Sequence, residues 1–275
     1  MKESSLKENN MIKQSIVNTA KKVIPHGVRI SLRKLNWKYH YLVQSSMTSS
    51  SEAKVYCPIA KKEFETFVKI GGNKITPSNG ARARQRLVWH YLEHETGLLK
   101  DKVRVLHTAP ELSYYKILSN SPNIDYVPGD KMVDGYSNQT GIANIDLTDL
   151  KFEEDSFDYL ISNHVLEHIP DDRLAMSEIF RVLKRGGKAI ITVPIREDST
   201  ETYENDSVKT PKDRQKHFGQ WDHVRWYGTD IKDRLESVGF KVKMTKYAEK
   251  FSKEEFERFG FKNDYIIEAQ KHVSS

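Results

Sequence analysis

From residue 103 onward, short apolar stretches alternate with longer amphipathic ones. The apolar stretches predict strands at 103–107, 124–130, 142–146, 157–165, 188–195, 241–247 and 264–270. The amphipathic stretches predict helices at 112–120, 171–187 and 228–240. This alternation predicts an α/β fold with a parallel sheet and helices on both faces. Ligands on such sheets bind beyond the carboxyl ends of the strands.

Residues 1–50 have a different pattern, in which many basic residues are interspersed with apolar ones. The spacing of Ile16, Ala20, Val23 and Ile24 predicts a helix that Pro25 ends or bends. A serine-rich linker follows this segment. Two interpretations of the basic stretch at 12–43 remain open: attachment to a membrane surface or an acidic partner, or an arm packed on the core with a solvated basic face.

Residues 51–100 form a second N-terminal segment, for which the sequence predicts a small β unit followed by a helix. Short alternating strands at 54–80 surround a Gly71-Gly72 turn, which indicates a small β unit. The next stretch, 81–99, is an amphipathic helix with its apolar face at Leu87, Val88, Tyr91 and Leu92 and with Gly97 at the expected cap.

Composition adds constraints on the kind of protein. The 275 residues are 37% hydrophobic and 30% charged, as in soluble globular proteins. The net charge of +6 favours anionic partners, but the basic residues are dispersed, so we expect no nucleic-acid partner. The sequence has neither a membrane-spanning apolar run nor a signal-peptide block, and Cys57 is the only cysteine. These features predict a cytoplasmic protein.

Polar groups follow several predicted strands at the edge where ligands bind. The first strand is followed by Ala109-Pro110-Glu111, the second ends at Asp130, the third is followed by Asp146-Leu147 and the fourth by Asn163-His164. A carboxylate at Asp130 can accept both ribose hydroxyls, or Asp130 is a turn residue after Pro128-Gly129. A carboxylate at Asp146 can accept from an adenine amine. The set describes an adenosine-shaped site.

Residues 152–195, "FEEDSFDYLISNHVLEHIPDDRLAMSEIFRVLKRGGKAIITVPI", resemble the core of class I S-adenosylmethionine-dependent methyltransferases of the type-11 kind. Within these, "LHTAPE" at 106–111 and "FGQWDHVRWYG" at 218–228 resemble a narrower group that lacks the glycine-rich turn. The resemblance implies a Rossmann-like methyltransferase domain over 101–275, with an acceptor-side insertion at 196–227. It implies S-adenosylmethionine as cofactor, bound by His107, Ala109, Pro110, Glu111, Asp130, Asp146, Leu147, Asn163 and His164.

The resemblance extends to the β unit. Members of the narrower group begin with a zinc ribbon, but three of its four ligand positions here are Ala60, Thr76 and Asn79, with Cys57 as the fourth. A structural zinc site needs four ligands, mostly thiolate or imidazole. We therefore expect a degenerate ribbon without metal, held by its own packing.

The insertion carries the candidate acceptor chemistry. An oxygen or nitrogen acceptor must lose a proton, so a base helps the transfer. His223 beside Asp222 is the predicted base, unless "DHVR" is a structural corner; His164 and Tyr203 complete the catalytic set. The predicted substrate contacts are Arg84, His217, Gln220, Arg225 and Tyr227. Arg84 and Arg86 contact an anionic acceptor or form salt bridges with the core.

Three functions fit these features. The first is methyl transfer to an oxygen or nitrogen of a small polar molecule, such as a saccharide or glycan precursor. The second is a methyltransferase-fold protein that binds cofactor or a partner without turnover. The third is a nucleotide-dependent oxidoreductase on a similar sheet. The sequence argues against it, because the G-x-G-x-x-G turn of such enzymes is missing. Glu111 has two open roles: it caps the helix that follows, or it orients the donor's amino group.

Overall fold

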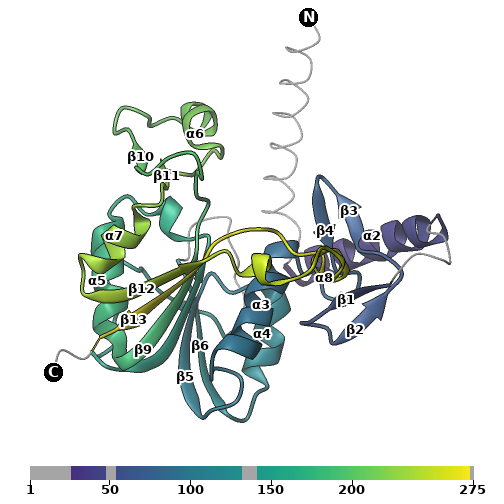
Figure 1. Ribbon diagram of the computed structural model, residues 1–275, viewed down its shortest axis with the longest axis horizontal. Helices are drawn as coiled ribbons and strands as arrows, with labels where there is room; N and C mark the ends of the chain where they lie inside the picture. The colour runs from purple at the N-terminus through teal and green to yellow at the C-terminus, as the bar shows by residue number, and fades with distance from the viewer. Residues whose placement is uncertain (1–25, 48–53, 132–140, 273–275) are drawn as a thin grey trace, which may run out of the picture.

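The structure is a computed structural model that describes residues 26–47, 54–131 and 141–272. The helix predicted around residues 16–24 lies outside this part of the chain. Figure 1 shows a central sheet with a smaller β unit beside it and a short ribbon above the upper ends of the strands. These three parts are described in turn.

The central sheet has seven strands in the order β12-β13-β9-β8-β5-β6-β7. Their bounds are β5 Val103–Thr108, β6 Ile124–Asp130, β7 Ala143–Asn144, β8 Phe157–Asn163, β9 Leu183–Thr192, β12 Phe240–Thr245 and β13 Ile266–Lys271. The predicted α/β class is confirmed, and the strands from β5 to β9 have the Rossmann order 3-2-1-4-5. The order reverses between β5 and β8, which is where such sheets bind ligands.

Two expectations about the sheet were wrong in detail. Strand β13 runs antiparallel to both β9 and β12, so the sheet is mixed rather than wholly parallel. The third strand, predicted at 142–146, is reduced to Ala143–Asn144, because the Asp146–Asp149 bridge turns the chain away.

Helices cover both faces of the sheet, as the alternation predicts. Helices α3 (Ala83–Glu95) and α4 (Leu112–Ser119) lie on one face, and α5 (Asp172–Val182) and α7 (Ile231–Glu236) lie on the other. Each face has its own apolar core. Helix α5 ends at Val182 rather than at a glycine cap, because Leu183 already pairs with Phe157 of β8, and after a β-bulge the pairing of β9 with β8 resumes at Lys188.

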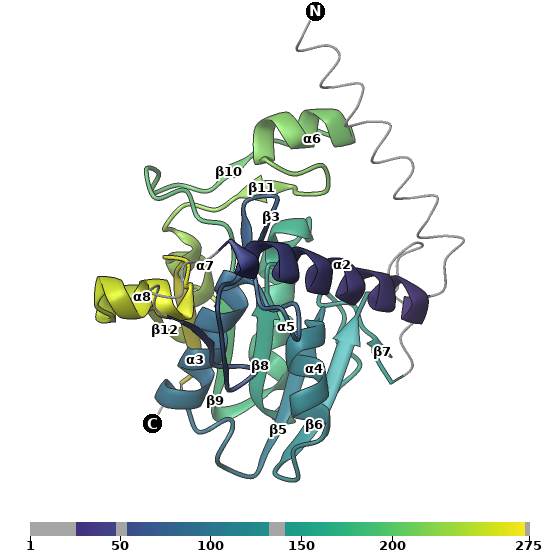
Figure 2. The ribbon, with the colours of Figure 1, turned by 90° about the vertical axis from the view of Figure 1, so that its right-hand side faces the viewer.

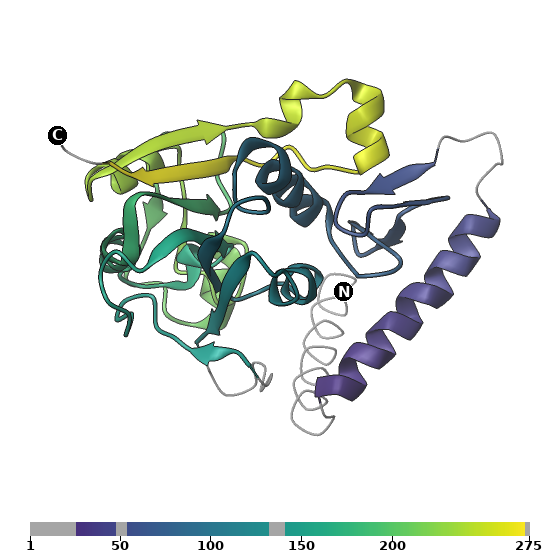
Figure 3. The same ribbon diagram turned by 90° about the horizontal axis from the view of Figure 1, so that it is seen from below.

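The small unit consists of two hairpins. Strands β1 (Val55–Cys57) and β2 (Lys62–Phe64) form one hairpin; β3 (Val68–Ile70) and β4 (Asn73–Ile75) form the other around the predicted glycine turn. The unit packs against α3 and against α8 (Lys253–Phe259) from near the other end of the chain, as Figure 3 shows from below. Helix α2 (His26–Ser46) lies along its outer side, clear of the sheet (Figure 3).

The insertion forms the ribbon above the sheet. Strands β10 (Tyr203–Glu204) and β11 (Arg225–Trp226) pair antiparallel, and α6 (Pro211–Phe218) lies between them in the chain. Two 3-10 turns, η1 (Leu166–His168) and η2 (Tyr247–Lys250), complete the elements among the described residues. In Figures 1 and 2 the ribbon stands over the carboxyl ends of the parallel strands, so it can roof a ligand bound there.

Candidate active site

The turn after β5 brings the backbone close to the ligand edge without a glycine. Ala109 adopts a left-handed φ of 48°, and its N–H donates to the carbonyl of Gly129 at the end of β6. Non-glycine residues rarely take this conformation, and they do so mostly at functional sites. Ala109 lines the cavity described below, as predicted for a cofactor-side residue.

Glu111 occupies the N-cap position of α4, but its side chain makes no cap hydrogen bond. One carboxylate oxygen lies 2.8 Å from His107 Nε2, and the other accepts from Asn163 Nδ2 at 3.0 Å. His107 Nδ1 in turn lies 2.9 Å from the Tyr126 hydroxyl. Of the two predicted roles, side-chain capping is therefore not observed, and Glu111 ties the first strand's turn to the end of β8.

Asp130 and Asp146 stand at neighbouring strand ends and both line the cavity. Burial raises the pKa of Asp130. Although burial opposes it, bonds from Lys131 and Thr148 lower the pKa of Asp146 to about 2. Gly129 has no room for a side chain, because a Cβ there would lie 2.5 Å from Ile145. Both acids are thus held at the edge where ribose and adenine groups bind in Rossmann folds.

A cavity of about 660 Å³ opens at this edge, between the strand ends and the insertion. Small-molecule sites range over about 300–1,000 Å³, so the cavity can hold a nucleoside-sized ligand with an acceptor beside it. Its lining comprises Thr108, Ala109, Gly129, Asp130, Lys131, Ile145, Asp146, Leu147, Thr148, His164, Val165, His168, Ile169, Pro170, Asp171, Leu174, Arg214, Trp221 and Asp222.

The predicted cofactor residues divide into two layers. Ala109, Asp130, Asp146, Leu147 and His164 line the cavity. The remaining predicted residues lie outside the lining; they are His107, Pro110, Glu111 and Asn163. Within the outer layer, hydrogen bonds join Glu111 to His107 and to Asn163.

Histidines gather where β8 ends. His164 has a left-handed φ of 55° and its Nδ1 lies 3.1 Å from the carboxylate of Glu167. Burial, helped by the charge of Arg84, lowers the pKa of His164 to about 3, so its ring is neutral. His223 is 8% exposed, its Nδ1 donates to the carbonyl of Phe218, and it does not line the cavity. The predicted base therefore lies one layer behind His168, which does line it.

The other predicted acceptor residues have different surroundings. Asp222 lines the cavity and accepts from the exposed Gln220 at 2.8 Å. Tyr203 and His217 bond to each other at 2.8 Å on the ribbon, away from the cavity lining. Arg84 is half-buried and outside the lining, although its charge reaches His164.

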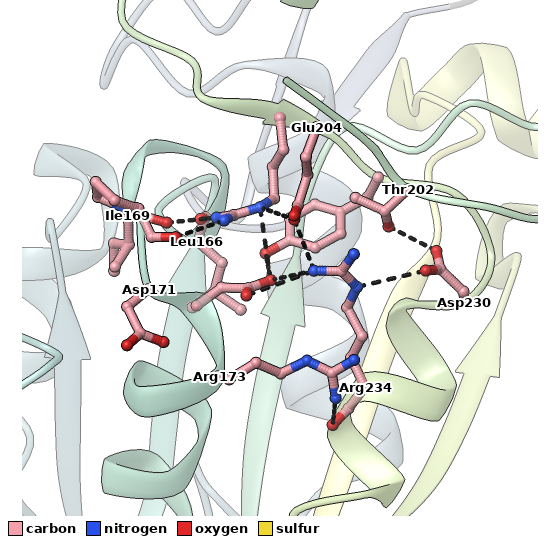
Figure 4. A network of polar contacts seen from close by, with 12 residues as sticks. Leu166, Ile169, Asp171, Arg173, Thr202, Glu204, Asp230 and Arg234 are labelled. Atoms are coloured by element: carbon pink, nitrogen blue, oxygen red, sulfur yellow. Dashed lines mark hydrogen bonds and ion pairs between the residues drawn. The ribbon is translucent and has the colours of Figure 1, made fainter. Parts of the chain in front are cut away.

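Arg225 and Tyr227 belong to a buried network that holds the insertion. Arg225 donates to the carbonyls of Leu166, Ile169 and Pro170 and forms an ion pair with Glu204 at 2.7 Å. The Tyr227 hydroxyl donates to Asp172, which also pairs with Arg234 at 3.1 Å. Figure 4 shows these contacts between the loop after β8, the ribbon and α7.

This network also shifts the pKa of Glu204, which lies in the insertion. Burial opposes ionisation of Glu204, but Arg225 and Arg234 outweigh it and lower the pKa of Glu204. Because Arg225 is 3% exposed and Tyr227 is fully buried, neither is free to meet a substrate in this conformation. Their observed contacts position the insertion over the cavity.

Sequence patterns did not single out several of the cavity residues. Arg214 on α6 lines the cavity, and its Nε is buried without a hydrogen-bond partner among the described residues. Lys131 and Thr148 bond to Asp146, and their proximity to the predicted acids was the available signal. For Arg214 there was none, because α6 is polar apart from Pro211 and Phe218 and so has no apolar stripe that would orient it.

Residues 120–191 match the family model described as "Methyltransferase domain". This stretch contains Asp130, Asp146 and His164, which line the cavity at the strand ends. Over these residues the chain is therefore similar to a methyltransferase domain. S-adenosylmethionine is its cofactor, and the cavity at the switch point fits such a ligand, since Asp130, Asp146 and Ala109 line it at the carboxyl ends of the strands.

Curated relatives of the methyltransferase domain act on different acceptors. Phosphoethanolamine N-methyltransferase 2 of Caenorhabditis elegans is 46% identical over 43 residues, 16% of this chain and 10% of that protein. Sterol 24-C-methyltransferase of Gibberella zeae is 29% identical over 133 residues, 44% of this chain and 34% of that protein. Demethylmenaquinone methyltransferase of Oceanobacillus iheyensis is 33% identical over 73 residues, 26% of this chain and 31% of that protein. The chain thus spans a tenth to about a third of the length of these relatives.

Solved structures similar to the chain include two methyltransferases. The first, described as a sarcosine dimethylglycine methyltransferase from Galdieria sulphuraria, has a TM-score of 0.46 and 16% identity, covering 68% of this chain and 85% of that one. The second, phosphoethanolamine N-methyltransferase 2 of Haemonchus contortus with S-adenosyl-L-methionine, has a TM-score of 0.44 and 17% identity, covering 67% and 52%.

Proposed function

We propose that this protein transfers the methyl group of S-adenosylmethionine to an oxygen or nitrogen of a small polar acceptor. The observation that carries the proposal is that one cavity joins both sides of such a reaction. Asp130, Asp146 and Leu147 line it at the strand ends, and Arg214 and Trp221 line it from the insertion. An enzyme that holds donor and acceptor in one enclosed space lowers the reaction barrier, because the two groups no longer have to meet and align by diffusion.

In this proposal, different residues of the cavity bind the cofactor, limit access of water and contact the acceptor. When bound, the cofactor supplies an electrophilic methyl group on a sulfonium. Asp130 holds the ribose hydroxyls, and the pinned insertion limits access of water. His168, which is 29% exposed and lines the cavity, is placed to contact the acceptor. The role of His223 as base stays a prediction, because its ring lies behind His168 with centroids 4.7 Å apart.

Arg214 supports an acceptor that carries an anionic group. It lines the cavity, and among the described residues it forms no ion pair there. A cation left without a carboxylate partner at a cavity wall suits a phosphate or carboxylate on the ligand. Trp221, 41% exposed, adds a flat apolar surface beside it. A saccharide precursor with a phosphate or carboxylate combines these two requirements.

The test has two steps. Calorimetric titration with S-adenosylhomocysteine tests the cofactor site, and the absence of binding at millimolar ligand would overturn the proposal. Transfer of labelled methyl groups to phosphorylated, carboxylated and neutral saccharides then tests the acceptor. Cofactor binding without transfer to any acceptor would favour the non-catalytic alternative.

A matched pair of arginine variants tests the anionic acceptor. R214Q should raise the KM for the acceptor by about tenfold or more with a smaller change in kcat, because it removes uniform binding energy. R185Q, at the far end of β9 on an exposed position, should leave both constants unchanged. Equal constants for R214Q and the unaltered enzyme would remove Arg214 from the acceptor site.

We also propose that α2 attaches the protein to an anionic membrane surface. Its large apolar side chains at residues 28, 32, 35, 39 and 42 follow a spacing of three and four residues and are 48–65% exposed. The helix has no acidic residue, and Arg33, Lys34 and Lys38 are exposed on it. Among the described helices, none is long and apolar enough to cross a membrane. The charge and the apolar stripe support binding in the plane of a lipid surface.

A further inference from the structure

Beside the cavity, a carboxylate and two imidazoles converge. Glu167, His168 and His223 each place one ligand atom within 4.8 Å of the others. Glu167 and His168 come from η1, and His223 comes from the insertion that roofs the cavity. We propose that these three residues bind a divalent metal ion of the Zn²⁺ type. This site is separate from the degenerate ribbon around Cys57, where the sequence predicts no zinc.

The carboxylate of Glu167 is buried but only partly hydrogen-bonded. Its side chain is 1% exposed. One oxygen accepts from His164 Nδ1 at 3.1 Å and lies 4.0 Å from His223 Nε2. The other oxygen, Oε2, is buried with no hydrogen-bond partner among the described residues. A buried carboxylate oxygen without a partner is costly, and a bound cation would remove that cost.

Both histidines are prepared as metal ligands. His223 Nδ1 lies 3.1 Å from the carbonyl of Phe218, which can only accept, so Nδ1 carries the proton and Nε2 keeps its lone pair toward Glu167. His168 Nδ1 lies 3.3 Å from the carbonyl of Asp222 and 3.4 Å from its carboxylate. A ring nitrogen that donates to a carbonyl or carboxylate is the usual outer shell of a metal-binding histidine.

The number and type of ligands select the ion. Two imidazoles and one carboxylate are the protein ligands of several catalytic zinc sites, which leave a fourth position open. Mg²⁺ and Ca²⁺ prefer all-oxygen ligands. Zn–N bonds are about 2.0–2.1 Å, so ligand atoms now up to 4.8 Å apart must draw in by about 1 Å. His168 lines the cavity, so the open position faces the acceptor side.

Hydrogen bonds around the site join η1, which carries Glu167 and His168, to the insertion, which carries His223. The N–H of Val224, next to His223, donates to the carbonyl of Glu167 at 2.9 Å. Arg225 bonds to the carbonyls of Leu166 and Ile169 on either side of Glu167 and His168. With metal bound, His223 is a ligand and not the free base that "DHVR" predicts.

Metal analysis of the full-length chain, purified without a histidine tag and without chelator, tests the site. After chelation and buffer exchange, titration with Zn²⁺ should give one bound ion per chain, and Co²⁺ should give a visible absorption band. Mg²⁺ should not compete. Failure of the unaltered protein to bind either Zn²⁺ or Co²⁺ overturns the proposal whatever the variants do.

Variants assign the ion to its ligands. E167Q and H223Q should each weaken Zn²⁺ binding by about 100-fold or more, since even outer-shell changes cost about 10–100-fold. The control H94Q, on the exposed end of α3, should bind as the unaltered chain does. Unchanged Zn²⁺ affinity in folded E167Q and H223Q, or equal loss in H94Q, contradicts the assignment.

The outcome is independent of the methyltransferase proposal. Titration of the metal-free chain with S-adenosylhomocysteine reports on the strand-end site alone. Cofactor binding without Zn²⁺ binding overturns only the metal site, and Zn²⁺ binding without cofactor binding overturns only the proposed function.

Discussion

Asp130 is the predicted ribose-binding side chain of the proposed cofactor site. It ends β6 and lines the cavity, where a carboxylate can accept two ribose hydroxyls. Charge-assisted hydrogen bonds are each worth about 1.5–3 kcal/mol, so D130A should weaken binding of S-adenosylhomocysteine by at least about tenfold. Calorimetric titration measures this loss.

The control for D130A is available on the same strand. Asp125 lies toward the other end of β6, in a surface pair with Arg104 at 3.0 Å. D125A should leave the affinity for S-adenosylhomocysteine unchanged. Equal affinity in D130A and the unaltered protein would mean that Asp130 is only the turn residue that follows Pro128-Gly129.

The residues at the strand ends could be found from the sequence, but their orientation could not. The end of a buried strand is visible in the pattern, which placed Ala109, Asp130, Asp146 and His164 at the cavity. Whether a side chain there faces the ligand or the core depends on partners distant in sequence. Glu111 illustrates this, because Asn163, one of its partners, comes from another strand.

At the scale of single elements, the buried arginine Arg86 of α3 connects the small β unit to the end of α8. Arg86 is fully buried and donates to the carbonyls of Lys74, Ala81, Phe259 and Gly260. It also donates to the Thr76 hydroxyl, which bonds to the sulfur of Cys57 at 3.2 Å. Burial lowers the pKa of Arg86 to about 10, so it keeps its charge at neutral pH. The Arg86 guanidinium thus links Thr76 and, through its hydroxyl, Cys57, which are two of the four positions that the sequence resemblance compares with zinc ligands.

Replacing this arginine should destabilise the protein. R86M leaves several buried carbonyls without a donor, at about 1–3 kcal/mol each, so we expect a loss of about 3–5 kcal/mol in the free energy of unfolding. Urea denaturation measures it. R258M, which removes the exposed ion pair with Glu63 and a cation–π contact with Tyr56, should cost no more than about 1 kcal/mol. Similar losses in both variants would contradict a central role for Arg86.

Helix α2 makes a separate prediction about membrane contact. One side holds it to the β unit, where Gln44 exchanges hydrogen bonds with Lys69 and Tyr41 packs edge-on against Phe64. The double variant L32E/L35E should reduce sedimentation with anionic vesicles by about tenfold or more, because it replaces two apolar contacts with repelled charges.

I117E, which changes an exposed apolar residue on α4, is the control. Binding to vesicles that is unchanged in L32E/L35E contradicts the membrane proposal. Concentration-dependent dimers that this double variant abolishes would instead assign the stripe to a second copy of the chain.

At the scale of the whole molecule, His90 joins α3 to the C-terminal segment. Its ring contacts Tyr247, Phe251, Phe259 and Phe261. Burial, together with the charge of His94, lowers the pKa of His90 from 6.5 to about 4. The folded state therefore favours the neutral ring. Its contribution to stability is fully present above pH 6.5 and is lost as the pH falls toward 4.

The variant H90F isolates this contribution. It retains the aromatic contacts and cannot be protonated, so the fall in unfolding midpoint between neutral pH and about pH 5 should be smaller than in the unaltered protein. Denaturant unfolding at both pH values measures the difference. An equal fall in both proteins would assign the acid sensitivity to carboxylates elsewhere.

The fold was largely predictable, and the failures have physical causes. Alternation of apolar strands and amphipathic helices is a local pattern, so β5, β6 and β8 fell close to where they were predicted, whereas β9 begins five residues earlier and ends three earlier than predicted. The direction of β13 is not encoded locally, because a strand sequence looks the same whether its neighbours run parallel or antiparallel. The end of α5 was missed because "LKRGG" has a helix-ending composition but begins β9, where Leu183 pairs with Phe157 of β8.

The position of β13 has a consequence for synthesis on the ribosome. It lies between β9 and β12, yet it is translated after both. Until it emerges, the inner edge of β9, with buried Ile190 and Ile191, has no partner. An unpaired apolar edge is a template for wrong pairing with other chains. The nascent protein therefore passes through an aggregation-prone stage that ends only when β13 inserts, and slowed translation or truncation within β13 would prolong that stage.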